Sequence, residues 1–447
     1  MKTNLFPFFY YFILGISLLF FVGCASTRPP KQLKYTANLL KTSPDLKQSF
    51  TGFVLYDPAK KEFLYEQYAD KYMTPASNTK LYTFFAGLNL LGDSIPAIQY
   101  SIKSDSLFFW GMGDPSFLNA DFGEVDSLYN FLKSRKETLV YLPRPTKDAG
   151  LGPGWSWDDY TSYYSSERSK FPIYANNLFV EYTLEDNAIT VKPPYFKDYV
   201  TLVDTLERNK FLQRDFDGNT YKVNPNRMKR NFTRAAPFHY SDTLFVNLLA
   251  DTLKRAIVFI EGQLLPKERT TFYSHPIDTL YRKMLQPSDN LYAEQILLMC
   301  SAMLSDTLSS RATINCMKDS VFADAPAELA WVDGSGLSRY NMFTPRTTIR
   351  LLEKIYNKVG EEERLFGMLA AGGVSGTIRN WYAGKNGNPY VFAKTGTLSN
   401  NHCLSGYLKA KSGKLLMFSF MHNHYTSSSN NMKMIMQTIL EDIYTRY

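Results

Sequence analysis

The sequence predicts an α+β protein in which an antiparallel sheet flanked by helices is split by a large, mostly β insertion. Strand-like runs and a helix precede residue 96, and helical patterns, three strand-like runs and a last helix follow residue 275. Between them, residues 96–275 consist of short aromatic-rich runs broken by Gly, Pro, Asn and Asp. Because structureless loops of this length are uncommon in compact domains, the middle is expected to fold as one or two inserted domains.

Each part is justified by its local pattern. In the first part, GFVLYD and EFLYEQY flank the polar PAKK and predict a hairpin, and the apolar spacing after Lys80 predicts a helix ending at a C-cap, Gly92. In the middle, the strand-like runs are SLFFWG, TLVYLPR, NAITVK and AIVFIEG. In the last part, the predicted helices are IDTLYRKML, NLYAEQILLMCSAML, TPRTTIRLLEKIYNKV, EEERLFGMLA and MKMIMQTILEDIY, and the strands are YVFAKTG, CLSGYLKA and KLLMFSFMH.

Length and composition favour a globular protein with real cores. The chain has 447 residues, of which 45% are hydrophobic and 15% aromatic, enough for two or three domains. The net charge of +8 is spread without a Lys/Arg-rich block, and no zinc-type cysteine pairs or nucleic-acid motifs occur. We therefore expect no nucleic-acid partner, whereas a basic surface suits work near an anionic polymer or membrane.

The amino-terminal segment has the pattern of an export signal. One early lysine precedes an apolar run from Leu5 to Val22, followed by Gly23 and Cys24 and then a polar tail. A single transmembrane helix is the alternative, because the run is long enough to span a bilayer. Phe-Val-Gly-Cys resembles a bacterial lipobox, with Phe21 unusual at its first position, and implies cleavage of residues 1–23 and lipid attachment to Cys24. The predicted product is an exported, membrane-anchored lipoprotein on the periplasmic side.

The remaining cysteines and the histidines give weak signals. Cys300, Cys316 and Cys403 are odd in number, so they cannot all pair; Cys300 and Cys316 either bridge adjacent helices or, more commonly for such residues, are small buried hydrophobes. His422-x-His424 lacks carboxylate or cysteine partners nearby, which favours surface or loop histidines over a metal site.

The stretch TPASNTKLYT contains a serine that is a candidate nucleophile and a lysine that is a candidate base. Ser77 precedes an apolar run and is either an ordinary N-cap or a nucleophile. If it begins the helix, Lys80 lies one turn further on the same face. A serine hydroxyl needs a base, and a lysine acts as one only when burial or a neighbouring cation lowers its pKa.

Two further motifs complete a pattern. Lys394-Thr395-Gly396-Thr397 ends an apolar strand, and its alternative interpretation is an edge strand with a glycine turn. Ser288-Asp289-Asn290 begins a helix, where capping by Ser or Asp is the alternative. In the order Ser-x-x-Lys, Ser-Asp-Asn, Lys-Thr-Gly, the three match the signatures of penicillin-recognising serine acyltransferases and β-lactamases.

The chain resembles the class C low-molecular-mass penicillin-binding proteins, the D-alanyl-D-alanine carboxypeptidase/endopeptidase family. That family has a large insert between the first two motifs, and WGMGDPSF, GPGWSWDDY, DGSGLSRYN and GGVSGTIR look like its secondary signatures. The resemblance is strongest from Ser288 onward and thinnest between about 185 and 270. It implies a penicillin-binding/β-lactamase-like transpeptidase domain made of residues 24–95 and 276–447, with residues 96–275 inserted.

The resemblance also implies roles for the motif residues. Ser77 attacks the carbonyl between two terminal D-alanines of a peptidoglycan stem peptide, and Lys80 takes its proton. Ser288 relays a proton to the leaving nitrogen, with Asn290 orienting the substrate amide and Lys80. Lys394 binds the terminal carboxylate and helps to keep Lys80 neutral by like-charge proximity. β-Lactams are implied as covalent inhibitors, and no metal or organic cofactor is needed.

Further groups are implied to recognise the substrate. Thr395 and Thr397, on either side of Gly396, offer hydroxyls to the carboxylate, and the backbone N–H groups of Ser77 and Thr397 form an oxyanion hole. Asp158 and Asp159 are the candidates to bind the ammonium of a third-position diamino acid. In that family the second acidic position faces the active site, which favours Asp159, and Arg339 is expected to bind the carboxyl group of the same residue. The alternatives are that Asp159 caps a turn and that Arg339 is structural.

Two other functions compete with a carboxypeptidase or endopeptidase. A β-lactamase shares the three motifs, but the long insertion and DGSGLSRYN speak against it. A non-catalytic penicillin sensor or cell-wall-binding scaffold is the second rival. Nothing needed for turnover is missing, and the single amino-terminal apolar segment offers no multi-pass membrane region.

Overall fold

The computed structural model describes residues 30–186, 188–206, 210–227, 229–325, 327–384 and 387–447. The predicted export signal and Cys24 lie outside these residues, so both stay predictions. Within the described ranges, no helix combines the length and the apolar character needed to cross a bilayer.

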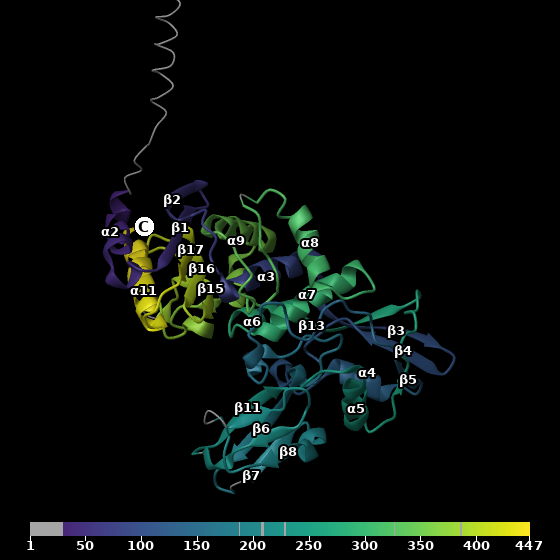
Figure 1. The fold of residues 1–447 in the computed structure, drawn as a ribbon. Helices are drawn as coiled ribbons and strands as arrows, with labels where there is room; N and C mark the ends of the chain where they lie inside the picture. Colours follow the sequence, from purple (N-terminus) through teal and green to yellow (C-terminus); the bar gives the residue numbers. More distant parts are fainter. Residues whose placement is uncertain (1–29, 187, 207–209, 228, 326, 385–386) are drawn as a thin grey trace, which may run out of the picture.

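A six-stranded sheet joins the first and last parts of the chain (Figure 1). Its order is β14-β15-β16-β17-β1-β2, and every neighbouring pair is antiparallel. The strands are β1 (Phe50–Asp57), β2 (Glu62–Gln67), β14 (Ala370–Ala371), β15 (Val391–Leu398), β16 (Asn401–Lys409) and β17 (Leu415–Asn423). Because β1 pairs with β17, the two ends of the chain share one domain.

Both faces of this sheet are covered, as alternation along β1 shows. Phe53 and Leu55 pack with α2 (Lys34–Thr42) and α11 (Ser429–Arg446), whereas Val54 and Tyr56 join the core on the opposite face. Successive strand residues point to opposite faces, so an apolar run buried on both sides is what a central strand requires. The predicted α+β fold with an antiparallel sheet flanked by helices is confirmed.

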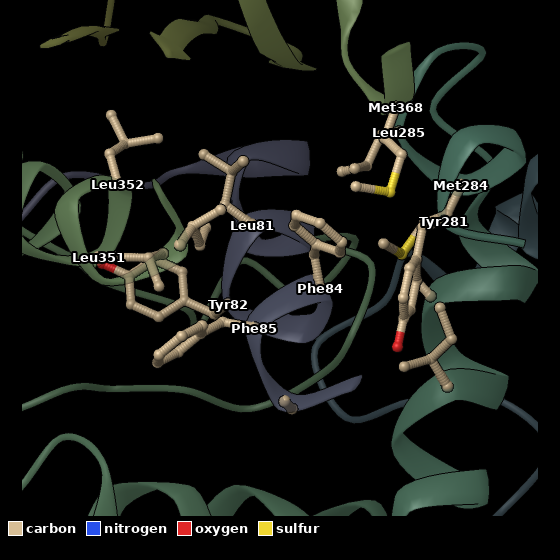
Figure 2. Close-up of a cluster of buried hydrophobic side chains, with 14 of the residues drawn as sticks. Leu81, Tyr82, Phe84, Phe85, Tyr281, Met284, Leu285, Leu351, Leu352 and Met368 are labelled. Atoms are coloured by element: carbon tan, nitrogen blue, oxygen red, sulfur yellow. The ribbon is translucent and has the colours of Figure 1, made fainter. Parts of the chain in front are cut away.

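The second face packs against helices centred on α3 (Thr79–Leu90), whose residues from Thr79 to Gly87 are all buried. The surrounding helices are α6 (Ile277–Leu285), α7 (Asn290–Leu304), α8 (Ser310–Ser320), α9 (Pro345–Val359) and α10 (Glu362–Met368). Figure 2 shows Leu81 and Phe84 of α3 among side chains of α6, α9 and α10. This packing fixes α3, and with it the residues that precede the helix.

The middle of the chain has an apolar core of its own, drawn from residues 97–272. A five-stranded sheet has the order β12-β5-β4-β3-β13, and two three-stranded sheets have the orders β11-β6-β7 and β8-β10-β9. The strands are β3 (Ser94–Lys103), β4 (Ser106–Gly111), β5 (Thr138–Tyr141), β6 (Asn177–Thr183), β7 (Ala188–Lys192), β8 (Val200–Leu202), β9 (Leu212–Arg214), β10 (Tyr221–Val223), β11 (Phe232–Pro237), β12 (Val258–Phe259) and β13 (Thr270–Pro276). The segment leaves and rejoins the first domain at one point, where the amide of Ile277 donates to the carbonyl of Asp93 at 2.9 Å.

Several local predictions need correction. The middle segment also holds two helices, α4 (Ser127–Ser134) and α5 (Asp242–Leu253), and the run AIVFIEG yields only the two-residue strand β12. Helix α3 is capped by Leu91 in an extended conformation, one residue before Gly92, so the predicted glycine C-cap is wrong. The cysteines agree with the favoured interpretation in part: all three are free thiols, Cys300 and Cys403 are buried, and Cys316 is half-buried.

Candidate active site

Ser77 lies in η3 (Ala76–Asn78), a short 3₁₀ turn that leads into α3. The residue that caps α3 is Asn78, and its side chain makes no capping hydrogen bond. The Ser77 hydroxyl oxygen instead accepts a hydrogen bond from Lys80 Nζ at 3.0 Å. Ser77 is therefore not a helix cap, and its half-exposed hydroxyl is held by the lysine one turn away.

Lys80 is completely buried and its ammonium has three partners. Besides Ser77, Nζ donates to Asn290 Oδ1 at 2.6 Å and to the backbone carbonyl of Ser335 at 2.7 Å. Asn290 is the first residue of α7, and its Nδ2 donates to the carbonyl of Tyr164 at 2.8 Å. The lysine ammonium is thus fixed by the η3 turn through Ser77, by α7 through Asn290, and by the loop that carries Ser335.

Burial sets the protonation of Lys80. It lowers the pKa of the Lys80 ammonium to about 8, against an opposing attraction from Asp289, Asp333 and Glu294. A lysine with this pKa is partly neutral near physiological pH and can accept a proton from its serine partner. Burial is thus the cause of the lowered pKa of Lys80. Repulsion between like charges contributes to the lowered pKa of a second lysine, Lys394.

Lys394 is buried on β15 and faces Ser288. Its Nζ donates to Ser288 Oγ at 2.7 Å and to the carbonyl of Thr395 at 2.7 Å. Burial and then the charge of Lys80 hold the pKa of Lys394 well below its usual value. Ser288 has a positive φ of 68°, which turns its side chain out of the helical path just before Asp289 caps α7.

Gly396 allows β15 to approach the serine turn. A β-carbon on Gly396 would lie 2.4 Å from the carbonyl oxygen of Pro75 and 2.9 Å from the amide nitrogen of Ser77. No larger residue fits there without moving backbone, so the Lys-Thr-Gly strand needs glycine at this point.

The two threonines beside Gly396 are already hydrogen-bonded. The hydroxyl of Thr395 lies 2.7 Å from that of Thr377, in the GGVSGTIR segment, and the hydroxyl of Thr397 lies 2.8 Å from His402 Nδ1. Burial lowers the pKa of His402 to about 4, so this imidazole is neutral. Each threonine side chain is therefore oriented before a ligand arrives.

A cleft of about 750 Å³ opens over these groups. Its lining residues come from both domains and include Ser77, Ser288, Asn290, Thr397, Asp159 and Arg339. Asp159 Oδ1 accepts a hydrogen bond from the Tyr164 hydroxyl at 2.7 Å, and Arg339 is exposed. Lys80, Lys394, Thr395 and Gly396 are buried. Six of the predicted site residues thus line one cleft, and Lys80 and Lys394 lie buried against Ser77 and Ser288 beneath it.

Sequence reasoning missed several groups that hold the site. The carbonyls of Ser335 and Tyr164 are backbone atoms with no side-chain signature. Glu294, fully buried on α7, accepts from the amides of Gly334 and Ser335 at 3.0 and 2.7 Å. Its signal was available, because an acidic residue inside an otherwise apolar helix is rarely buried unless it is paired.

The described part of the chain contains no group of three or more His, Cys, Asp or Glu side chains arranged to hold a metal ion. Of the two histidines considered above, His424 is exposed but His422 is buried on β17, with Nδ1 2.7 Å from the Thr51 hydroxyl. The prediction of a surface or loop position is therefore wrong for His422.

The serine is hydrogen-bonded to a buried lysine at the start of a buried helix, and both lie beside a Lys-Thr-Gly strand of an antiparallel sheet. This arrangement defines a penicillin-binding enzyme that acts through an acyl group on serine. The chain belongs to the D-Ala-D-Ala carboxypeptidase 3 (S13) family, whose model matches residues 33–443. It is a serine-type D-Ala-D-Ala carboxypeptidase, and the family resemblance seen in the sequence is confirmed.

Curated relatives agree with this assignment, and a solved structure shares the fold. The chain is 24% identical over 409 residues to penicillin-sensitive carboxypeptidase A of Dictyostelium discoideum, covering 79% of this chain and 78% of that protein. It is 24% identical over 423 residues to the D-alanyl-D-alanine carboxypeptidase DacB of Haemophilus influenzae, covering 85% and 86%. The crystal structure of penicillin-binding protein 4 (dacB) from H. influenzae superposes with a TM-score of 0.72 at 19% identity, covering 92% of this chain and 99% of that one.

Proposed function

We propose that this carboxypeptidase removes the terminal D-alanine of peptidoglycan stem peptides, or cuts cross-links between them, through an acyl-enzyme on Ser77. The observation that carries the proposal is the 3.0 Å hydrogen bond between Lys80 Nζ and Ser77 Oγ at the floor of the cleft. It places a lysine of lowered pKa within proton-transfer distance of the hydroxyl.

Acylation begins when neutral Lys80 takes the proton of Ser77 as Oγ attacks the carbonyl carbon between the two D-alanines. The negative charge that develops on the carbonyl oxygen is stabilised by the backbone N–H groups of Ser77 and Thr397, for which one donor is typically worth about 3–4 kcal/mol. The close approach of Gly396 to Ser77 supports this role, because it brings strand and turn together.

The leaving group needs a proton and a counter-charge. Ser288 relays a proton to the departing D-alanine nitrogen, and Lys394 binds the terminal carboxylate; their 2.7 Å contact supports a shared task. A bound carboxylate favours the charged form of Lys394 and so offsets the effect of burial on its pKa. Water then attacks the acyl-enzyme and releases Ser77.

Side-chain recognition is assigned to the rim of the cleft. Asp159 offers a carboxylate to the ammonium of a third-position diamino acid, and Arg339 offers a guanidinium to its carboxyl group. Opposite charges on two elements of the same rim support binding of a zwitterionic side chain.

The test is digestion of purified cell wall by the protein without residues 1–23, with the products analysed by mass. Release of D-alanine indicates carboxypeptidase action, and conversion of cross-linked dimers to monomers indicates endopeptidase action. Ser77→Ala removes the nucleophile and leaves the bonds of Lys80 to Asn290 and Ser335, so it should abolish hydrolysis and covalent penicillin labelling in a folded protein. Labelling that survives in this variant contradicts the proposal, and rapid release of hydrolysed penicillin by the wild type indicates a β-lactamase.

We also propose that the protein is exported and anchored on the periplasmic side by a lipid on Cys24. The support is the apolar run followed by Phe-Val-Gly-Cys. Cys24→Ser should leave catalysis intact and release the protein from membranes. A mature wild-type protein that lacks lipid and keeps residues 1–23 would show a transmembrane helix instead.

A further inference from the structure

One stretch of the inserted region, residues 148–169, contacts three polar groups that surround Lys80; we call it the bracing segment. The Tyr164 carbonyl accepts from Asn290 Nδ2 at 2.8 Å. The indole of Trp155 donates to Asp333 Oδ2 at 2.9 Å. Arg168 forms an ion pair with Glu294, Nη1 to Oε2, at 3.7 Å.

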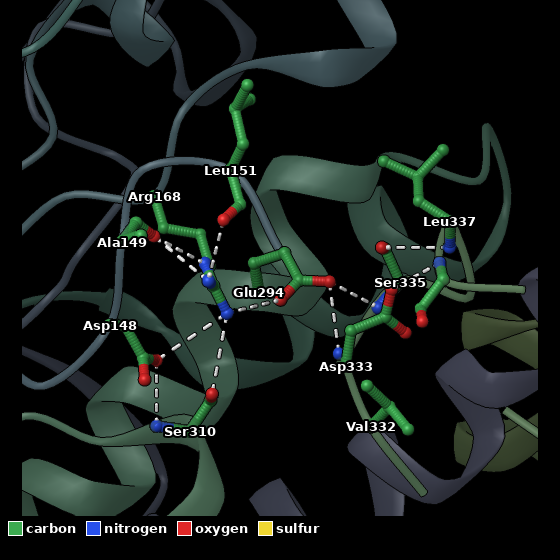
Figure 3. A network of polar contacts seen from close by, with 12 residues as sticks. Asp148, Ala149, Leu151, Arg168, Glu294, Ser310, Val332, Asp333, Ser335 and Leu337 are labelled. Atoms are coloured by element: carbon green, nitrogen blue, oxygen red, sulfur yellow. Dashed lines mark hydrogen bonds and ion pairs between the residues drawn. The ribbon is translucent and has the colours of Figure 1, made fainter. Parts of the chain in front are cut away.

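Arg168 is buried and held on most sides (Figure 3). Within the bracing segment, Nε and Nη2 donate to the Ala149 carbonyl at 3.1 and 2.9 Å, and Nη2 donates to the Leu151 carbonyl at 3.3 Å. Nη1 pairs with Asp148 at 3.6 Å and points at Glu294. Because the guanidinium is anchored in this way, it stays close to the carboxylate of Glu294.

Glu294 connects Arg168 to the catalytic lysine through the backbone of Ser335. Its Oε1 accepts from the amides of Gly334 and Ser335, and the carbonyl of the same Ser335 accepts from Lys80 Nζ at 2.7 Å. Its other oxygen, Oε2, has no hydrogen-bond partner within the described residues, which leaves the charge of Arg168 as its compensation. The contacts therefore run from Arg168 through Glu294 and Ser335 to Lys80.

We propose that Arg168 and Glu294 are positioning residues that hold Lys80 against Ser77, so that the inserted region takes part in acylation. The pair fixes the loop that carries the Ser335 carbonyl, and the negative charge of Glu294 favours the protonated form of Lys80. The inference rests on the proposed role of Lys80 as the base for Ser77.

The charges around this pair set the expected response. Lys80 faces the carboxylates of Asp289, Asp333 and Glu294 and the ammonium of Lys394. Burial and then the charge of Asp333 raise the pKa of Glu294 to about 7, and the charge of Arg168 opposes that rise, so Glu294 is ionised above that pH, where Lys80 titrates. Removing the charge at 294 takes away one of the three attractions on the Lys80 ammonium and should lower the pKa of Lys80.

The test is Glu294→Gln, which keeps the side-chain size and removes the charge. The second-order rate constant for acylation by a fluorescent penicillin is measured from about pH 5 to about pH 10. We expect the plateau to fall at least ~10-fold, because the ion pair with Arg168 is lost and the new amide nitrogen, a donor, faces the guanidinium, and the acid limb to move down by about 0.5 to 1 pH unit. Asp278→Asn is the matched control, since it neutralises a carboxylate paired with Arg364 at 2.7 Å between α6 and α10 and should change neither feature.

A second variant separates charge from geometry. Arg168→Lys keeps the charge but loses the bonds to Ala149 and Leu151, so it should lower the plateau and leave the acid limb in place. A wild-type plateau in Glu294→Gln overturns the inference, and so does a lowered plateau with an unmoved acid limb, which indicates a merely structural carboxylate. If Glu294→Gln shows no cooperative unfolding transition, a wild-type plateau in Arg168→Lys overturns it instead. Failure of the proposed function is recognised separately, because wild-type protein would then not be labelled on Ser77.

Discussion

The backbone of Gly396 approaches the amide nitrogen of Ser77 so closely that a β-carbon on the glycine would lie 2.9 Å from it. The contact joins the last part of the chain to the first at the reacting hydroxyl, because Gly396 lies on β15 and Ser77 lies in the turn before α3. The separation of strand and turn is therefore set by the absence of one side chain.

Gly396→Ala should lower the rate of acylation by penicillin at least ~100-fold, because the new methyl group forces β15 away from the serine turn and misplaces the oxyanion donors. Stopped-flow labelling measures the rate, and thermal unfolding checks the fold. Gly92→Ala is the control, since a β-carbon there has no neighbour within 4 Å. An acylation rate within threefold of wild type would show that the two elements separate freely.

The acylation rate should depend on pH through Lys80. With its pKa lowered to about 8, the lysine is protonated below that pH and cannot accept the serine proton. The rate should rise about tenfold per pH unit below this value and level off above it. The acylation rate is measured with penicillin. If this rate is constant from about pH 6 to about pH 9, Lys80 is not the titrating base.

Lys394→Ala should weaken acylation by peptides with a free carboxyl terminus by about 10- to 100-fold more than acylation by matched carboxamides, since it removes the counter-charge of the carboxylate. The measurement is kcat/KM for each peptide pair. Equal losses on the acid and the amide would mean that Lys394 acts only through Ser288 or Lys80.

Asp159→Ala should reduce kcat/KM on a stem peptide with a third-position diamino acid by at least ~10-fold, because the ammonium loses its carboxylate partner. Acylation by a simple penicillin, which has no such side chain, should hardly change. Asp158, which is more exposed and lines the same cleft, is compared as Asp158→Ala, and a smaller loss there assigns the ammonium to Asp159. Parallel losses on peptide and penicillin would assign Asp159 to the fold, through its bond to the Tyr164 hydroxyl.

Two buried tyrosines should respond oppositely to loss of their hydroxyl groups. The Tyr281 hydroxyl is buried without a hydrogen-bond partner in the described ranges, whereas that of Tyr407 donates to the Leu352 carbonyl at 2.8 Å. Tyr281→Phe should raise the free energy of unfolding by about 1 kcal/mol, and Tyr407→Phe should lower it by a similar amount. Urea unfolding measures both, and a destabilised Tyr281→Phe would reveal a bound water as partner.

Long, regular patterns made the first and last parts predictable. The β1–β2 hairpin, the strands β15 to β17 and the helices α6, α7, α9 and α11 are where apolar periodicity and turn residues place them. The aromatic residues of the middle segment favour strands, so its sequence predicts a mostly β region. Its helices nevertheless carried signals, namely the N-caps Asp126 and Ser241, followed by apolar residues at helical spacing.

In the site, the groups that could be predicted are side chains and those that could not are mostly backbone atoms. Side chains whose chemistry depends on residue type, such as Ser77, Lys80 and Lys394, could be named from three short motifs. Groups that act through backbone, such as the carbonyls of Ser335 and Tyr164, leave no trace in residue type because every residue has them. Their places depend on tertiary packing, so only the structure reveals them.

The neighbouring entry and exit of the inserted region, at Asp93 and Ile277, bear on protein engineering. Their 2.9 Å hydrogen bond would let a short linker replace everything between them, and the apolar core around α3 would survive such an excision. The trimmed protein would nevertheless lose Tyr164, Trp155 and Arg168, and with them the partners of Asn290, Asp333 and Glu294. A miniaturised version of this enzyme would therefore need redesigned polar residues at these three positions before it could work.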